Sequence, residues 1–260
     1  MIPAAPDVCQ LLKEISSCPF VASIRAGQSG PCQKIVQTQT GVAFHSPEPW
    51  SGRIDIAPIL FLSSNPSIDE EEMYPDLSWD TEQINDFFQN RFTSSSGWVD
   101  SQLRALKRDG SRTGWVRYWA AARARVSEIL DKPKSEVKPG IDFALTEVVH
   151  CKSRNQEGVR EALEFCSERF LERVLSISAA PVMIVYGDYA RRIVCRQYGS
   201  RISWRLPDKL AEFCLSDRQK ALVFLPAPNE RGSAKTLSAN VGSKGISIIR
   251  SHLDRSRLGD

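Results

Sequence analysis

Four short, mostly apolar runs in the chain have the length of buried β-strands. Continuous apolar runs, unlike alternating ones, are typical of parallel strands that are covered on both faces. The runs lie at residues 57–62, 141–150, 181–186 and 221–225. The segments between them place apolar residues at helical spacing. We expect helices over residues 7–15, with Asp7 as the N-cap, and over 80–92, 115–130, 158–175, 189–198 and 233–252.

The alternation of strands and helices predicts a fold class. It favours an α/β protein, a three-layer α/β/α sandwich with a central, mostly parallel four-stranded sheet. We find no repeat and no linker long enough to separate domains, so residues 1–260 are expected to form a single domain. Ligands of such sheets bind at the carboxyl edge. The loops expected there are 63–67, 150–155, 187–189 and 226–235.

Composition narrows the class of protein without identifying it. Of the 260 residues, 42% are hydrophobic and 25% are charged, which is ordinary for a globular protein and excludes global disorder. No apolar run approaches the ~20 residues that span a bilayer. The first seven residues lack the basic and apolar regions of a secretory signal, so we expect a cytoplasmic protein. Its seven cysteines are then expected to be reduced, structural or metal-bound.

The net charge of +3 conceals strong local imbalance. Residues 68–88 hold eight acids and no Lys or Arg, whereas residues 101–125 hold seven bases and one acid. The tail from 225 to 260 adds six bases against three acids. If the fold joins the two basic blocks, they predict a phosphate-facing surface. The alternative is that they are two solvated helix faces.

The first predicted strand ends in an unusual polar loop, Ser63-Ser64-Asn65-Pro66-Ser67. Its small residues let a ligand approach the backbone, and Pro66 makes the turn rigid. The Asn65 amide can accept from and orient a water molecule. The alternative is an ordinary polar turn after a strand.

Three further motifs follow in order at the ends of the other strands. Residues 146–151 read TEVVHC, and Cys166 follows Cys151 after 14 intervening residues. The strand at 182–186 ends at Gly187 before a helix, and 223–229 reads VFLPAPN. Together with the first loop, this set resembles the uracil-DNA glycosylase superfamily, in particular its bacterial and archaeal iron–sulfur branch. The resemblance covers roughly residues 8–250.

The resemblance implies a monomeric, bacterial, cytoplasmic enzyme that acts on DNA. It would be a monofunctional glycosylase of base excision repair, which hydrolyses the N-glycosidic bond of uracil and leaves an abasic site. By position, Ser64, Asn65 and Glu147 would serve catalysis, with Asn65 orienting water. Ser63 would contact the base, and Tyr74 or Phe92 would stack on it. The residues placed to contact the DNA backbone are Ser67, Asn229, Arg231, Ser233 and Lys235.

Two positions depart from the family pattern. Glu147 replaces the Asn that reads uracil, and Leu225 replaces the His that stabilises the leaving base anion. An ionised Glu only accepts hydrogen bonds, whereas a protonated Glu both donates and accepts, as an Asn amide does. Burial beside a base would raise its pKa. We therefore expect looser base selection, with xanthine or hypoxanthine accepted beside uracil. The alternative is that Glu147 forms a salt bridge and reads nothing.

The cysteines match the family's cluster ligation only in part. Cys18, Cys151 and Cys166 fall at ligand positions, but the partner of Cys18 in the family motif falls at Ile15, which cannot ligate. Cys32 or Cys9 would have to replace it. A 4Fe–4S cluster needs four thiolates, so Cys18, Cys32, Cys151 and Cys166 are the candidate set. The alternative is four buried apolar thiols.

Two other functions stay open. Loss of both signature side chains fits a non-catalytic member of the fold that binds DNA or abasic sites. An iron–sulfur redox or scaffold protein is the third interpretation.

Overall fold

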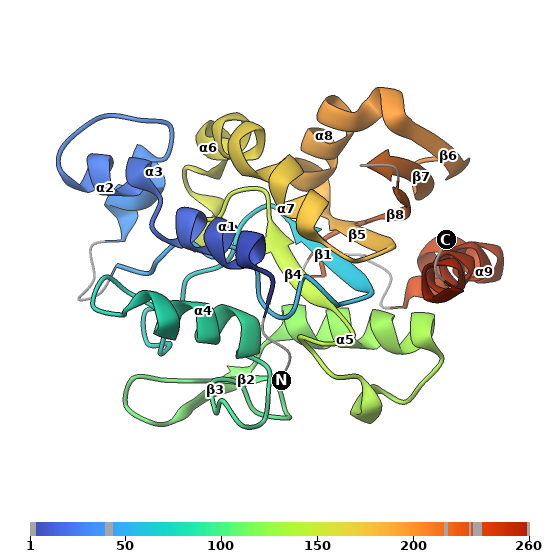
Figure 1. Cartoon of the computed structure of the whole chain (residues 1–260), viewed down its shortest axis with the longest axis horizontal. Helices are drawn as coiled ribbons and strands as arrows, with labels where there is room; N and C mark the ends of the chain where they lie inside the picture. The colour runs from blue at the N-terminus through green and yellow to red at the C-terminus, as the bar shows by residue number, and fades with distance from the viewer. Residues whose placement is uncertain (1–3, 40–43, 216–217, 229, 231–235, 259–260) are drawn as a thin grey trace.

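A six-stranded sheet forms the centre of the molecule (Figure 1). The computed structural model describes residues 4–39, 44–215, 218–228, 230 and 236–258. In spatial order the strands are β4 (Ala144–Glu147), β1 (Ile59–Ser63), β5 (Val182–Tyr186), β8 (Arg218–Leu225), β7 (Leu210–Leu215) and β6 (Ile202–Leu206). The first four strands run parallel to one another. β7 pairs antiparallel with β8 on one side and with β6 on the other. The carboxyl ends of β4, β1, β5 and β8 therefore lie at one edge.

Helices cover both faces of this sheet. The helices are α1 (Pro6–Ser16), α2 (Pro19–Arg25), α3 (Gln33–Thr38), α4 (Thr81–Asn90), α5 (Arg117–Leu130), α6 (Val159–Cys166), α7 (Glu172–Ile177), α8 (Gly187–Tyr198) and α9 (Leu237–Leu258). A π-helical turn, Ser167–Leu171, joins α6 to α7. Leu60 and Leu62 of β1 pack in one core with α1, α6, α7 and α8. Ile59 and Phe61 pack on the opposite face with α5 and α9.

The α/β class and the mostly parallel sheet are confirmed, but the predicted strand number of four is wrong. The two additional strands, β6 and β7, form a hairpin at the sheet edge. The middle of β6 is exposed, so Trp204 and its neighbours lack the apolar run by which the central strands were recognised. An edge strand needs less apolar character because one side faces water.

The predicted helices agree with the structure except in detail. Asp80 caps α4 by accepting from the Gln83 backbone N–H at 2.8 Å, and the Gln83 side chain accepts in return from the Asp80 N–H. The expected Asp7 cap is wrong, because α1 begins at Pro6 and Ala5 is its N-cap. The helix expected from 115 begins at Arg117, because residues 104–115 form a β-hairpin of β2 (Arg104–Leu106) and β3 (Arg112–Trp115).

The acidic and basic blocks pair with each other across this hairpin. Lys107 binds Glu71 at 2.6 Å, and Arg108 lies 3.6 Å from Asp76. Two of the seven bases in the basic block are therefore paired with acids of the acidic run. No helix in the described ranges is long and apolar enough to cross a membrane.

Candidate functional site

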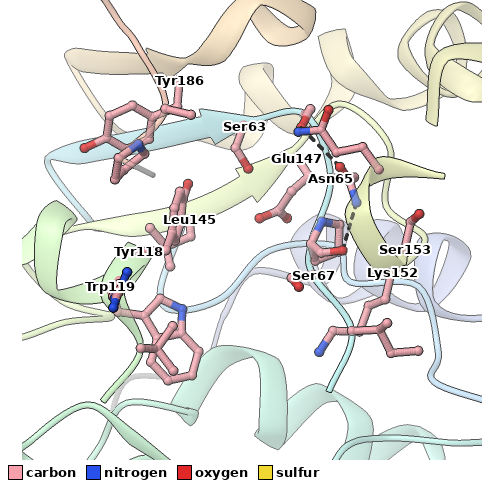
Figure 2. A pocket seen from close by; sticks show the side chains of 18 of the residues that line it. Ser63, Asn65, Ser67, Tyr118, Trp119, Leu145, Glu147, Lys152, Ser153 and Tyr186 are labelled. Carbon is pink, nitrogen blue, oxygen red and sulfur yellow. Dashed lines mark hydrogen bonds between the residues drawn. The ribbon is translucent and has the colours of Figure 1, made fainter. Parts of the chain in front are cut away.

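A cleft of about 960 Å³ lies at the carboxyl edge of the sheet. The loops that follow β1, β4 and β5 line it, together with 113–119 at the start of α5 and residues 227, 228 and 230 after β8. Figure 2 shows Tyr118, Trp119 and Tyr186 on one side of the view, and Asn65, Ser153 and Lys152 on the other. The predicted position of the site, at the ends of the parallel strands, agrees with this cleft.

The loop after β1 enters the cleft with its polar side chains. Ser63, Ser64, Asn65 and Ser67 all line it. The Asn65 amide is oriented at both ends: Oδ1 accepts from the Ser64 hydroxyl at 3.1 Å, and Nδ2 donates to the Pro66 carbonyl at 3.0 Å. A carbonyl oxygen has two lone pairs. Asn65 Oδ1 therefore keeps one acceptor site for a water or a ligand.

Glu147 lies at the centre of the cleft (Figure 2). It is the last residue of β4 and pairs in register with Ser63 of β1, which fixes its position beside the 63–67 loop. Its side chain is nearly inaccessible, with the residue 4% exposed, and Oε2 has no hydrogen-bond partner among the described residues. Burial and the nearby charge of Glu48 raise its pKa well above the usual value. The salt-bridge alternative for Glu147 is thus not what the structure shows.

A buried ionic cluster forms the floor beside Glu147. Arg91 binds Glu72 and also lies 3.3 Å from Glu48, and Lys152 binds Glu72 at 3.0 Å. Glu48 also accepts from Tyr74 at 2.8 Å. The two carboxylates balance the two cations. Arg91 and Lys152 lower the pKa of Glu72 to about 2, although its burial alone would raise it.

The side chains expected to stack on a base are not in the cleft. Tyr74 is fully buried and bonded to Glu48, and Phe92 packs edge-on against Trp119. Neither lines the cleft, whereas Tyr118, Trp119 and Tyr186 do. The sequence predicts a helix over 115–130, which contains Tyr118 and Trp119, but it predicts no cleft position for them or for Tyr186. The aromatic density of 115–119 at the start of a helix was the available signal.

The cleft contains polar atoms that protein groups leave unsatisfied. Within the described part of the chain, the hydroxyls of Tyr118 and Tyr186 are buried without a hydrogen-bond partner, as is Oε2 of Glu147. Buried polar groups are rarely left unpaired in folded proteins. Three of them facing one cleft point to a ligand with several polar atoms.

The residues predicted to contact DNA divide into two groups. Ser67 is exposed and lines the cleft. The other four, Asn229, Arg231, Ser233 and Lys235, lie outside the described residues. Exposed Arg117 and Arg192 line the cleft mouth, and so do the acids Asp69, Asp188 and Glu230. Leu225 ends β8 and is buried in the core that includes α5 and α9, so it brings no polar group to the cleft.

The four candidate cluster cysteines come together from distant segments. Cys18 precedes α2, Cys32 precedes α3, Cys151 follows β4 and Cys166 ends α6. The thiols of Cys32 and Cys151 are hydrogen-bonded, which raises the pKa of Cys151 and lowers that of Cys32. Cys166 and Cys18 lie close enough to Cys151 to raise its pKa further.

Packing between the surrounding helices holds this cysteine group in place. Phe20 of α2 packs edge-on against Phe165 of α6 at 4.6 Å, and Lys34 of α3 pairs with Glu161 of α6 at 3.7 Å. No group of three His, Cys, Asp or Glu side chains in the described ranges is arranged to hold a single metal ion. A four-iron cluster holds its thiolates farther apart than one ion does, and four thiols are the donor set it requires. The four cysteines therefore fit such a cluster chemically.

Comparisons with known proteins add no assignment. No protein-family model matches the chain, and no curated protein matches it.

Proposed function

We propose that the protein is a monofunctional DNA glycosylase that hydrolyses the N-glycosidic bond of uracil or a related deaminated base, leaving an abasic site. The observation that supports this most strongly is the juxtaposition of two elements at the carboxyl edge of the sheet. The Asn65 loop and the buried, unpaired Glu147 carboxyl face the same cleft. They would supply a water-orienting amide and a base-reading group within one pocket, at the edge of a mostly parallel α/β sheet.

Base recognition follows from the neutral state of Glu147. A protonated carboxyl donates through its O–H and accepts through its C=O. Uracil presents the complementary pair, the 4-oxygen and N3–H. Xanthine and hypoxanthine present the same oxo and N–H pair at their own edge. Tyr118 or Trp119 would stack on the extruded base from the other side of the cleft.

The bond-breaking step needs a positioned water. Asn65 Oδ1 accepts from that water and directs its oxygen at C1′, where positive charge develops as the base departs. Schiff-base chemistry, which would cut the strand, needs an uncommitted amine. The one lysine lining the described cleft, Lys152, is bound to Glu72 and lies 3.6 Å above the Tyr74 ring. The expected product is therefore an intact strand with an abasic site.

A 4Fe–4S cluster is part of this proposal. Cys18, Cys32, Cys151 and Cys166 would hold it and tie the short helices α2 and α3 to the sheet. The freshly purified protein should absorb at about 400 nm, as thiolate-bound clusters do. Cys166→Ala should abolish that absorbance, while Cys214→Ala, at an exposed thiol, should keep it. A colourless wild type with bound zinc or no metal would refute the cluster and leave the glycosylase proposal standing.

The function is tested by base release from oligonucleotides that contain uracil, xanthine or hypoxanthine, in single- and double-stranded form. The proposal predicts release of uracil and of at least one of the others. Strict uracil-only release would refute the looser selection. Tight binding to uracil or abasic DNA without base release would favour the non-catalytic binder.

A further inference from the structure

We propose that Glu147 is the general acid of the reaction and transfers its proton to the departing base. This inference rests on the proposed function and goes beyond base reading, because a reader keeps its proton while a general acid gives it up. Protonation by Glu147 would let the base leave as a neutral molecule and not as an anion.

The position of Glu147 suits this task. Its backbone is fixed by the parallel pairing of Ser63 with Glu147, so its carboxyl emerges beside the loop that carries Asn65. The side chain is directed into the cleft (Figure 2), and Oε2 has no protein partner in the described residues. The hydrogen-bonding capacity of this oxygen is thus not spent on a described protein group.

The groups around Glu147 keep the proton on it until a base arrives. Glu48, on the segment alongside β4, and burial both favour the neutral form. Arg91 at the end of α4 and Lys152 after β4 favour the ionised form, but both are bound to other carboxylates of the cluster. The neighbouring Tyr118 on α5 is itself neutral, because burial raises its pKa.

The cleft supplies few other groups that could neutralise a leaving anion. Leu225 stands at the strand end where the similar family carries a His, and a Leu side chain cannot stabilise charge. Arg91 and Lys152 are the cations nearest the floor, and they already balance Glu48 and Glu72. An acid at the base edge removes the need for an anion hole.

The proton balance of the step is complete. The C1′–N bond breaks with its electron pair on the base, and the Glu147 O–H proton moves to a base oxygen or nitrogen. The base leaves neutral and Glu147 becomes a carboxylate. Water adds to C1′ through its oxygen, and the proton that it loses returns to Glu147. The net reaction is hydrolysis with no other reactant.

The test compares two leaving bases in single-turnover reactions. Glu147→Gln keeps a donor and an acceptor but has no proton to transfer, and Glu147→Asn places the similar family's amide there. 5-Fluorouracil leaves more readily than uracil because fluorine stabilises its anion. We expect Glu147→Gln to release uracil at least about 100-fold more slowly than wild type, a typical loss of a general acid. On 5-fluorouracil the deficit should shrink to about tenfold or less, and Glu147→Asn should show the same contrast.

The pH profile gives a second readout. Wild-type release should fall as the pH rises through the raised pKa of Glu147, because the protonated acid is the active form. This limb should be absent in Glu147→Gln and present in Glu82→Gln, a matched change at an exposed carboxyl of α4 outside the cleft. Equal deficits on both bases, or an unchanged pH limb, would overturn the general acid and leave the glycosylase intact. If wild type releases neither base, the proposed function fails, and this inference fails with it.

Discussion

Glu147→Gln should change how the stability of the protein depends on pH, and this prediction does not depend on any substrate. The folded protein holds the Glu147 carboxyl neutral in a buried site, while the unfolded chain ionises it near its ordinary pKa of 4.5. A carboxyl whose pKa is raised on folding contributes stability at pH values below its unfolded pKa. That contribution is lost as the pH rises toward its folded pKa. Gln does not titrate, so the variant lacks this loss.

The magnitude follows from linkage. Each proton that the folded state holds and the unfolded state releases changes the free energy of unfolding by about 1.4 kcal/mol per pH unit. Between about pH 5.5 and about pH 7, the stability of Glu147→Gln relative to wild type should therefore rise, by at most about 2 kcal/mol.

Urea unfolding at both pH values measures this difference directly, since the midpoint and slope give each free energy. Glu82→Gln is the matched control, because its carboxyl is exposed, and its stability should follow wild type at both pH values. Parallel pH dependence of Glu147→Gln and wild type would show that Glu147 is ionised in the folded protein. That result would refute the neutral carboxyl on which base reading and proton transfer both depend.

Three other substitutions test the surrounding structure. Arg91→Ala should destabilise the fold by about 3–5 kcal/mol in urea unfolding, because it leaves the buried carboxylates of Glu48 and Glu72 with one cation, Lys152. A loss below about 1 kcal/mol would contradict the buried cluster. Asp80→Ala should cost about 1 kcal/mol through loss of the α4 cap, and no change in the urea midpoint would exclude the capping box. Trp115, 62% exposed at the cleft mouth, is placed to stack on a nucleotide. Trp115→Ala should therefore weaken oligonucleotide binding by about tenfold. The control is Trp204→Ala, because Trp204 is exposed on the edge strand β6 outside the cleft, and this change should leave the affinity unchanged. Equal effects of the two substitutions would show that Trp115 does not belong to the binding surface.

The central strands could be predicted because a strand buried on both faces is apolar at successive positions. The runs at 57–62 and 181–186 are apolar throughout, and each ends at a Ser or Gly where the chain leaves the sheet. Parallel connection then brings these ends to one edge. The placement of Glu147 and the 63–67 loop in one cleft follows from that rule.

The strands that the sequence did not predict have weaker apolar patterns. The 104–115 hairpin has strands of only three and four residues, and its second strand is half-buried to exposed, so neither strand shows the apolar run of a core strand. The edge strand β6 was missed for the same reason. Short exposed strands depend on their partners for stability more than on their own composition.

The interior of the site was beyond sequence reasoning for a different reason. The ionic cluster joins Glu48, Glu72, Arg91 and Lys152. These residues are far apart in the chain and are brought together only by the packing of four segments. The sequence made Tyr74 a candidate for stacking on a base, because an aromatic side chain can pack in a core or line a pocket. Its burial against Glu48 was decided by tertiary contacts.

The most direct test of the central claim is base release from a uracil-containing oligonucleotide by wild type, Asn65→Ala and Asn90→Ala. Asn90 lies at the end of α4 outside the cleft and serves as the matched control. Wild type and Asn90→Ala should release uracil at the same rate, and Asn65→Ala should be at least about 100-fold slower. Equal release by wild type and Asn65→Ala would contradict the assignment of the water-orienting amide. Absence of release by all three would contradict the enzyme itself.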